Sequence, residues 1–437
     1  MPDAVFKHGV KLAIETSRGD TPPLRSWFAN GRWFDIVTEG IPDLIPRQAT
    51  IFPPGHAGRR AMNQQAPVVG RKWSEGGLTA NVVADYLGAL LYGALGTGST
   101  NTVPSTTTNL KVNEALRADT DVVLTAQPSN GGAILEFAIY NASTGGLITI
   151  SGIDVYGNGA SETISYASSG SFYTRTSWSS VAASNINLTN SNAFGGSFSI
   201  HGFKYWEHTF SANESTNPTF SMERINDPQS GAASKSFMHP ALVLQSLTLN
   251  TPAGATDGVM TAESTFQGDP AEYQSPATTI NQASSLRIWP AWTLSVTRNN
   301  TSYCKITNQT LTVNAGGRNY FAACGTQSPQ GSFFGPQEVT GSQDILIDDE
   351  VEYLSWLGAS RMNLKFIWTT PWKLTSTDYM TLSASLSSAF VEGEPGLSDD
   401  DGAFSLSQDF RTITDGTDGI VKFTLRNGVP KSAYNIA

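Results

Sequence analysis

The stretch ILEFAIYNASTGGLITISGIDVYGNGASETISY, at residues 134–166, decides the fold class of this chain. Three short runs within it alternate apolar and polar side chains, which is the two-residue period of a half-buried β-strand. Glycine-rich turns such as GNG at residues 157–159 separate the runs at short spacing. The pattern is typical of an antiparallel β-sandwich. The three runs are Ile134–Tyr140, Leu147–Ile153 and Glu162–Tyr166.

Further runs of the same kind follow this stretch, and a different composition precedes it. The later runs are Phe172–Trp178, Ile186–Leu188 and Phe198–Phe203. Residues 100–110 read TNTVPSTTTNL and hold almost no side chain that could build a core, so they predict a linker. We therefore expect residues 112–204 to form a self-contained β-sandwich module.

A helix is predicted just before this linker. From Leu78 onward, apolar residues recur every three or four positions, which marks one face of an amphipathic helix, and Gly96 is expected to end it. These residues are Val82, Val83, Tyr86, Leu87, Leu90, Leu91 and Leu95. A second segment, Ile345–Leu357, predicts a strand that runs into a shorter helix. Both segments contain an acid-Tyr-Leu triplet, at residues 85–87 and 352–354.

Two pairs of strand-like segments outside the module resemble each other. Thr219–Asn226 and Thr293–Asn300 share the pattern Thr-x-Ser-x-x-Arg-x-Asn. Each is followed by a second similar run, Leu247–Asn250 after the first and Leu311–Asn314 after the second. Because the spacings differ, the pattern predicts a degenerate duplication, with two related β units in one chain.

Composition limits the kinds of partner that the chain can have. Of its 437 residues 15% are charged, against about 25% in ordinary soluble domains, and the formal net charge is −10. A surface that neutralises phosphates needs clustered Lys and Arg, so specific DNA binding is not indicated. The N-terminus lacks the basic and apolar regions of a signal peptide, and the longest apolar run is too short to cross a bilayer. We therefore expect a protein made in a cytoplasm, with no membrane segment.

The sequence offers no recognisable catalytic, cofactor-binding or metal-binding residue. None of its five histidines lies in a metal-ligand spacing, and it has neither a nucleophile elbow nor a phosphate-binding loop. His201 and His208 are expected to be structural. Cys304 and Cys324 are expected to be reduced thiols, with a disulfide between them as the alternative.

Acidic clusters are the remaining candidates for chemistry. They lie at Asp348–Glu350, Glu392–Glu394, Asp399–Asp401 and Asp415–Gly419. Solvated loops are the expected meaning of such runs, and calcium loops or a glycosidase carboxylate pair are the alternatives. The last cluster is first of all a hairpin turn, because it lies between two strand-like runs.

Two aromatic pairs stand out in the N-terminal 75 residues, which are rich in Pro, Gly and Arg. The pairs are Trp27-Phe28 and Trp33-Phe34. In one interpretation these rings close the core of their own domain. In the other they bury against a neighbouring subunit, which makes all four residues candidate interface residues.

Several of these segments, in their order along the chain, resemble the major tail tube proteins of siphophages. They are Thr219–Asn226, residues 242–268, Trp292–Asn300, and Val339–Gly341 leading into Ile345–Tyr353, with the helix ending at Gly96. The resemblance implies a mainly β fold in which a tail-tube β-sandwich or barrel has flanking helices, and the paired segments described above predict that this unit is duplicated. It also implies that residues 112–204 are an inserted immunoglobulin-like module. The expected division is 1–111 and 205–437 for the tail tube domain, with the module between them.

The resemblance further implies a function and partners. The expected protein is a structural virion component and not an enzyme, assembled in the host cytoplasm as stacked rings around a lumen. DNA would pass through that lumen during ejection without specific binding. Expected partners are other copies of itself, the tail terminator and tail-tip proteins, and a tape measure protein in the lumen. The residues that remain without the module are about twice what one sandwich-plus-helix unit needs, and together with the paired segments this favours rings of three subunits over rings of six. The alternative is a tail-tip or baseplate protein that binds host glycans.

Overall fold

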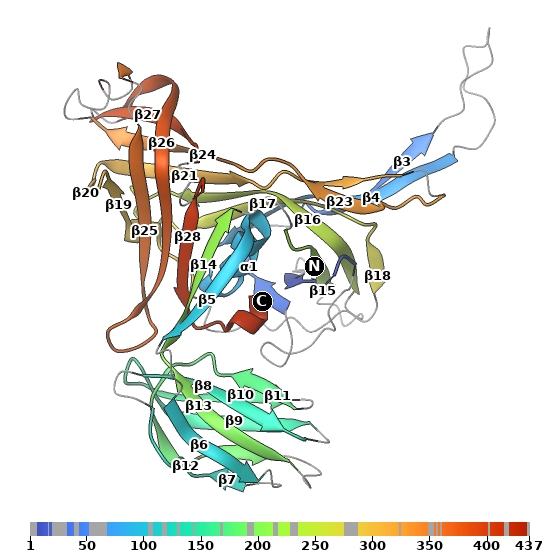
Figure 1. Ribbon diagram of the computed structural model, residues 1–437, viewed down its shortest axis with the longest axis vertical. Helices are drawn as coiled ribbons and strands as arrows, with labels where there is room; N and C mark the ends of the chain where they lie inside the picture. Colours follow the sequence, from blue (N-terminus) through green and yellow to red (C-terminus); the bar gives the residue numbers. More distant parts are fainter. Residues whose placement is uncertain are drawn as a thin grey trace, which may run out of the picture.

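The fold is mainly β, as predicted, with one α-helix among the residues that the structure describes. Figure 1 shows a large curved sheet structure with a separate two-sheet sandwich below it. The computed structural model describes residues 7–15, 17–19, 33–38, 43–51, 68–103, 108–115, 120–128, 132–142, 145–166, 169–189, 196–212, 217–227, 235–274, 287–322, 325–347, 354, 357–358, 361–400, 403–414 and 419–434.

The large body, here called the main body, consists of two consecutive halves joined in one sheet system of eighteen strands. The strands of the first half are β1 Lys7–Ile14, β2 Trp33–Ile36, β3 Ile45–Ile51, β4 Val68–Asn81, β5 Gly96–Val103, β14 Tyr205–Ala212, β15 Phe220–Asp227, β16 Lys235–Thr251, β17 Thr261–Gly268 and β18 Glu272–Gln274. Those of the second half are β19 Leu294–Arg298, β20 Thr301–Ser302, β21 Ile306–Asn314, β24 Glu338–Leu346, β25 Met362–Lys373, β26 Tyr379–Asp400, β27 Ala403–Thr412 and β28 Lys422–Asn427, with the separate hairpin β22 Gly317–Tyr320 and β23 Gly331–Phe334.

Helix α1, Ala84–Leu95, lies in the core of the main body. It is shorter than predicted, because Leu78 belongs to β4 and the helix begins six residues later. It is also not amphipathic: all of its residues are buried except Asp85 and Tyr92, because strands of both halves pack around it. Gly96 ends the helix as predicted, with a left-handed φ of 81° that glycine adopts without strain.

The strand predicted at Ile345 is present as the end of β24, and its helical continuation is described only at single positions. Leu354 and Leu357 are helical, and Gly358 donates a backbone hydrogen bond to the Leu354 carbonyl at 3.0 Å. The Glu352-Tyr353 part of the second triplet lies outside the described residues. Both leucines are more than half exposed, so this segment differs from the buried helix α1.

The two halves share one pattern of strand pairing. In the first half β1 pairs with β2 and β15, and β16 pairs with β15, β17 and β18, while β4 pairs with β3 and β17. The second half contains the same seven antiparallel pairings in the same chain order. Its strands β19, β20, β21, β24, β25, β26, β27 and β28 correspond, in that order, to β1, β2, β3, β4, β15, β16, β17 and β18. Helix α1 follows β4 in one half, and the helical positions Leu354 and Leu357 follow β24 in the other. The main body is therefore a structural duplication.

A phenylalanine opposite a glycine fixes the register of this duplication. Phe266 of β17 pairs with Gly76 of β4, and Phe410 of β27 pairs with Gly341 of β24. A Cβ atom on either glycine would come within 2.5 Å of a backbone carbonyl oxygen, that of Asp43 or of Thr310. The close backbone approach explains why both positions are glycine.

The similar segments in the sequence do not mark equivalent strands, although the predicted duplication exists. Thr219–Asn226 covers most of β15, whose counterpart is β25, whereas Thr293–Asn300 covers β19, whose counterpart is β1. Asn299 and Asn300 are not in a strand. Their φ values of 49° and 65° place them in the turn between β19 and β20, which is the conformation of a type I′ hairpin. The shared pattern therefore reflects similar composition and not structural equivalence.

The sandwich below the main body, here called the module, consists of β6–β13. Its strands are β6 Thr108–Ala115, β7 Thr120–Val122, β8 Ile134–Tyr140, β9 Gly146–Asp154, β10 Gly159–Tyr166, β11 Gly170–Tyr173, β12 Trp178–Thr189 and β13 Ser197–Phe203. They form two four-stranded sheets, β10-β9-β12-β7 and β11-β8-β13-β6, around a separate hydrophobic core that includes the buried Trp178. The last two strands lie in opposite sheets, whereas the final two strands of an immunoglobulin domain share one.

The segment predicted as a linker contains strands. Residues 96–103 form β5, and residues 108–115 form β6, so only 104–107 separate the main body from the module and these lie outside the described residues. Strand β5 has few apolar residues, but it pairs along its full length with β14, from Gly96 opposite Ala212 to Val103 opposite Tyr205. The module is thus inserted between two adjacent strands of the main body.

Candidate assembly surfaces

Trp33 and Phe34, two of the predicted interface residues, are buried inside the subunit. Trp33 is 3% exposed and packs with Ala13 and Met238. Phe34 is 4% exposed, and its ring stacks on that of Tyr434 at 5.6 Å between centroids. The burial favours the interpretation that these two rings close the core of their own domain. Trp27 and Phe28 lie outside the described residues.

The two candidate histidines contact the protein itself. His208 is fully buried, and its Nε2 lies 2.8 Å from the Val429 carbonyl and 3.0 Å from Asn427 Oδ1. Nε2 therefore carries the proton and donates it. Burial lowers the pKa of His208 to about 4, and these hydrogen bonds only partly oppose the effect. His201 Nδ1 lies 2.9 Å from Asn109 Oδ1 within the module. Both arrangements are those of structural histidines.

No described group of His, Cys, Asp or Glu side chains is placed to hold a metal ion. Cys304 is an exposed free thiol, and Cys324 lies outside the described part of the chain. The acidic residues 348–350 and 415–418 also lie outside the described part of the chain. None of the described helices has the length and apolar character that crossing a bilayer requires.

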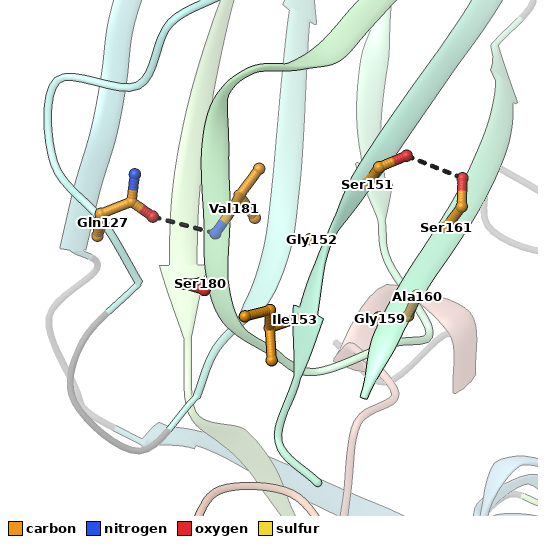
Figure 2. Close-up of a pocket in the computed structure, with 9 residues that line it drawn as sticks. All are labelled: Gln127, Ser151, Gly152, Ile153, Gly159, Ala160, Ser161, Ser180 and Val181. Carbon is orange, nitrogen blue, oxygen red and sulfur yellow. Dashed lines mark hydrogen bonds between the residues drawn. The ribbon is translucent and has the colours of Figure 1, made fainter. Parts of the chain in front are cut away.

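A shallow groove lies on the β10-β9-β12-β7 sheet of the module (Figure 2). Small and polar side chains line it: Ser151 and Ser161 are joined by a 3.0 Å hydrogen bond, and Gln127 accepts one from the Val181 backbone N–H. The nine described residues that line it include no acid, base or thiol, so they provide no group for general acid–base chemistry.

The hairpin of β3 and β4 forms an arm that extends away from the rest of the main body (Figure 1). Arg47 and Arg71 on this arm are exposed, and the Arg71 guanidinium lies 4.7 Å above the ring of Phe321. Among the described residues β3 pairs only with β4, so its outer edge is open. An open strand edge offers unpaired backbone groups to another chain.

A second open edge lies at the opposite side of the main body, where β26 and β27 form another projecting hairpin (Figure 1). From Phe390 to Asp400, β26 pairs only with β27 within the described residues. Glu392 and Glu394 are exposed there, and Glu392 accepts a 3.0 Å hydrogen bond from Arg411. One edge of the main body therefore carries basic side chains and the other acidic ones.

The module also contacts the main body directly. The Ser177 hydroxyl donates to the Leu374 carbonyl at 2.5 Å, and the Tyr156 hydroxyl accepts a 2.7 Å hydrogen bond from the Lys373 backbone N–H. Phe203 and Trp206 have ring centroids 5.1 Å apart across the junction. These contacts tie the module to the β25–β26 hairpin, so it is not merely tethered by its two connections.

Together, the duplicated sheets and the two open edges define a structural β protein suited to assembly through strand edges. The chain belongs to the phage tail tube protein family, because the model of that family matches residues 6–412, nearly the whole chain. It is a structural protein of the bacteriophage virion, a component of the tail that self-assembles into the tail tube and is assembled in the host cell. This class of protein is typically not enzymatic, and the host-binding alternative is not favoured. A search of curated proteins finds no match.

Proposed function

We propose that three copies of this chain form each ring of the tail tube, with pseudo-sixfold symmetry. The proposal is carried by the duplication: seven strand pairings occur twice in one chain, so each subunit contributes two similar units to the ring. Three such subunits give six units around the axis. Cyclic rings of this kind need a heterologous interface, in which two different surfaces of the same chain meet.

The two open edges support this arrangement. The basic β3–β4 arm and the acidic β26–β27 end are different surfaces at opposite sides of the main body, as a heterologous interface requires (Figure 1). An isologous dimer would instead bring each surface against its own copy, so like charges would oppose each other.

The ring would enclose the lumen through which the DNA passes during ejection. A net charge of −10 suits that role, because a negative wall repels phosphates and avoids the counterion release that makes basic channels bind DNA. The tape measure protein would occupy the lumen before ejection, and terminator and tip proteins would cap the two tube ends. The role is mechanical and involves no catalysis.

The module would project from the outside of the tube as an immunoglobulin-like domain. Its separate core and its insertion between two paired strands support an accessory role, although its last two strands depart from the immunoglobulin order.

A reconstruction of the assembled tube in cross-section tests the stoichiometry. Three module densities per ring are expected, since each chain carries one module. Six identical densities per ring would rule out the trimer and establish a hexamer of duplicated subunits. Tubes that failed to form from the purified full-length chain, under conditions where it stays folded, would contradict the tube-forming role itself.

A further inference from the structure

Among the described residues two strand pairs join the halves of the main body, β14 with β28 and β16 with β21. Only the second pair connects two strands that each have a counterpart in the other half, and this pair occurs once among the described strands. Strands β16 and β21 pair antiparallel, from Ser246 opposite Asn314 to Thr251 opposite Gln309. In the centre of this seam the hydroxyls of Thr248 and Thr312 lie 2.9 Å apart. The seam connects the β16 position of the first half to the β3 position of the second, because β21 is the counterpart of β3.

The strands that would form the corresponding second seam are the two with open edges. The counterpart of β16 is β26, and the counterpart of β21 is β3. Both are paired on one side only in the described part of the chain, over residues 390–400 of β26 and along β3. They lie far apart in one subunit (Figure 1), so they can meet only between subunits.

The register of this second seam follows from the phenylalanine–glycine pairs. Glu263, which lies three residues before Phe266, pairs with Thr248. Ser407, which lies three residues before Phe410, pairs with Gly396. Gly396 therefore takes the position of Thr248.

The glycines of the two pairs fix the equivalent positions on the partner strands, β21 and β3. Thr340, which lies one residue before Gly341, pairs with Thr312. Glu75, which lies one residue before Gly76, pairs with Ile45. Ile45 therefore takes the position of Thr312. Continuing one step along each strand places Leu44 opposite Leu397, where the internal seam has Leu311 opposite Leu249.

We propose that residues 43–47 of one subunit, which include the first residues of β3, pair antiparallel with residues 392–398 of β26 in the next subunit, with Ile45 opposite Gly396. This contact repeats between subunits the seam that β16 and β21 make within the chain, and so closes the ring. The inference rests on the proposed ring-forming function and adds the strand pair, its direction and its register.

Charge complementarity supports the pairing. Arg47 occupies the position of Asn314, whose partner in the internal seam is Ser246. The corresponding part of β26 is the stretch from Glu392 to Gly396, where Glu392 and Glu394 are exposed. The seam between subunits would thus place Arg47 beside Glu394 and beside Glu392, which already pairs with Arg411, where the internal seam has neutral side chains. Such pairs steer association and disfavour wrong registers.

The proposed seam also differs from the internal one in its backbone donors. Pro46 takes the place of Val313, and Pro395 lies in the bulged part of β26 that takes the place of Leu247. Proline has no N–H, so fewer hydrogen bonds form at this position than in the internal seam. Proline on an exposed edge also hinders uncontrolled edge-to-edge pairing before assembly.

A cysteine pair tests the register. In a Cys304→Ser/Cys324→Ser background, Ile45→Cys and Gly396→Cys would place two thiols at the positions of the neighbouring Thr248 and Thr312 hydroxyls. A Cβ atom on Gly396 meets nothing within 4 Å, so this substitution is tolerated within the subunit. We expect mild oxidation of assembled tubes to give covalent dimers and trimers, and each single-cysteine variant to give no covalent trimer.

Tubes of normal appearance that form no covalent link between the two positions would overturn the strand pairing and leave the tube-forming function intact. Absence of tubes from the cysteine-free parent would instead count against the tube-forming function. Covalent species running beyond the trimer, up to hexamers, would keep the seam and contradict the proposed stoichiometry.

A charge exchange tests the seam independently. Arg47→Glu and Glu394→Arg should each reduce the yield of tubes, and the double variant should restore much of it. Glu272→Arg, at an exposed position on β18, is the matched control and should assemble normally. Equal loss in the double variant and in the two single variants would contradict the proposed contact.

Discussion

Val103, the last residue of β5, lies directly opposite Tyr205, the first residue of β14. Paired residues of antiparallel strands have Cα atoms about 4.5–5.5 Å apart, which is the span of a tight hairpin turn. The whole module is inserted at this point. The two strands remain neighbours whatever connects them.

Replacing residues 104–204 by Asn-Gly should therefore leave a main body that folds and still assembles into tubes. Asn-Gly favours the type I′ turn that joins adjacent strands. Trp206 loses the rings of Phe203 and Tyr173, so the deletion variant should carry Trp206→Thr to remain soluble. Electron microscopy of the product is the measurement. A soluble, folded deletion variant that forms no tubes would place the module in the tube wall.

Trp27→Ser/Phe28→Ser should give a folded subunit that assembles poorly, if these rings lie between subunits. Circular dichroism checks the fold, and sedimentation of the assembled material checks the tubes. Trp33→Ser is the comparison, because Trp33 is buried in its own subunit and its loss should cost stability, on the order of 3–5 kcal/mol. Normal tubes from the double variant would remove Trp27 and Phe28 from the contact surface.

Gly341→Ala should destabilise the main body, because the new Cβ atom would lie 2.5 Å from the Thr310 carbonyl oxygen and 2.4 Å from the Phe410 ring. Overpacking of this kind costs about 1–3 kcal/mol. Gly396→Ala is the matched control, since its Cβ atom meets no neighbour within 4 Å. Thermal unfolding of the two variants measures the difference, and equal melting temperatures would contradict the close approach.

Lowering the pH from about 6.5 to about 4 should reduce the free energy of unfolding, because His208 and His239 resist protonation in the folded protein. Burial lowers the pKa of each to about 4, while an unfolded histidine has its ordinary pKa of 6.5. Below pH 6.5 the unfolded chain takes up protons that the folded chain does not, so the folded state loses stability on the order of 3 kcal/mol per histidine. Partly buried carboxyls such as Asp269, whose pKa burial raises, act in the opposite direction.

The His208→Gln variant separates the histidine contribution from that of the carboxyls. Its amide can still donate to the Val429 carbonyl, but it does not titrate. Urea unfolding at pH 7.5 and pH 5 should show a smaller loss of stability for His208→Gln than for the natural chain. The same loss in both proteins would mean that His208 is not the titrating group.

Much of the module was predictable from sequence because its strands are defined locally. The run Ile134–Tyr140 has the same bounds as β8, since alternation and glycine turns fix where a half-buried strand begins and ends. Strand β5 was not predictable in this way. The sequence GTGSTNTV has no apolar face, and it is a strand only because β14, more than 100 residues away, pairs with it.

The candidate interface residues show the same limit. Phe34 is buried because it stacks on Tyr434, at the other end of the chain, and no local pattern reveals such a partner. The duplication was visible in outline, yet its true register depends on Gly76 opposite Phe266 and Gly341 opposite Phe410. These pairs combine a small residue and a large one across two strands, so a comparison of segments along the sequence does not detect them.

The internal seam between β16 and β21 also changes how a ring comes together. In a ring of six separate subunits, six contacts must form between independent molecules, each at a cost in translational and rotational freedom. Here half of those contacts are already made when the chain folds. A trimeric ring then needs only three encounters, and the two halves of a subunit cannot be supplied in unequal amounts. Because the two seams are formed by different residues, their sequences can also differ. The internal seam forms when the chain folds, whereas prolines and charged side chains keep the edges of the other seam unpaired until assembly begins.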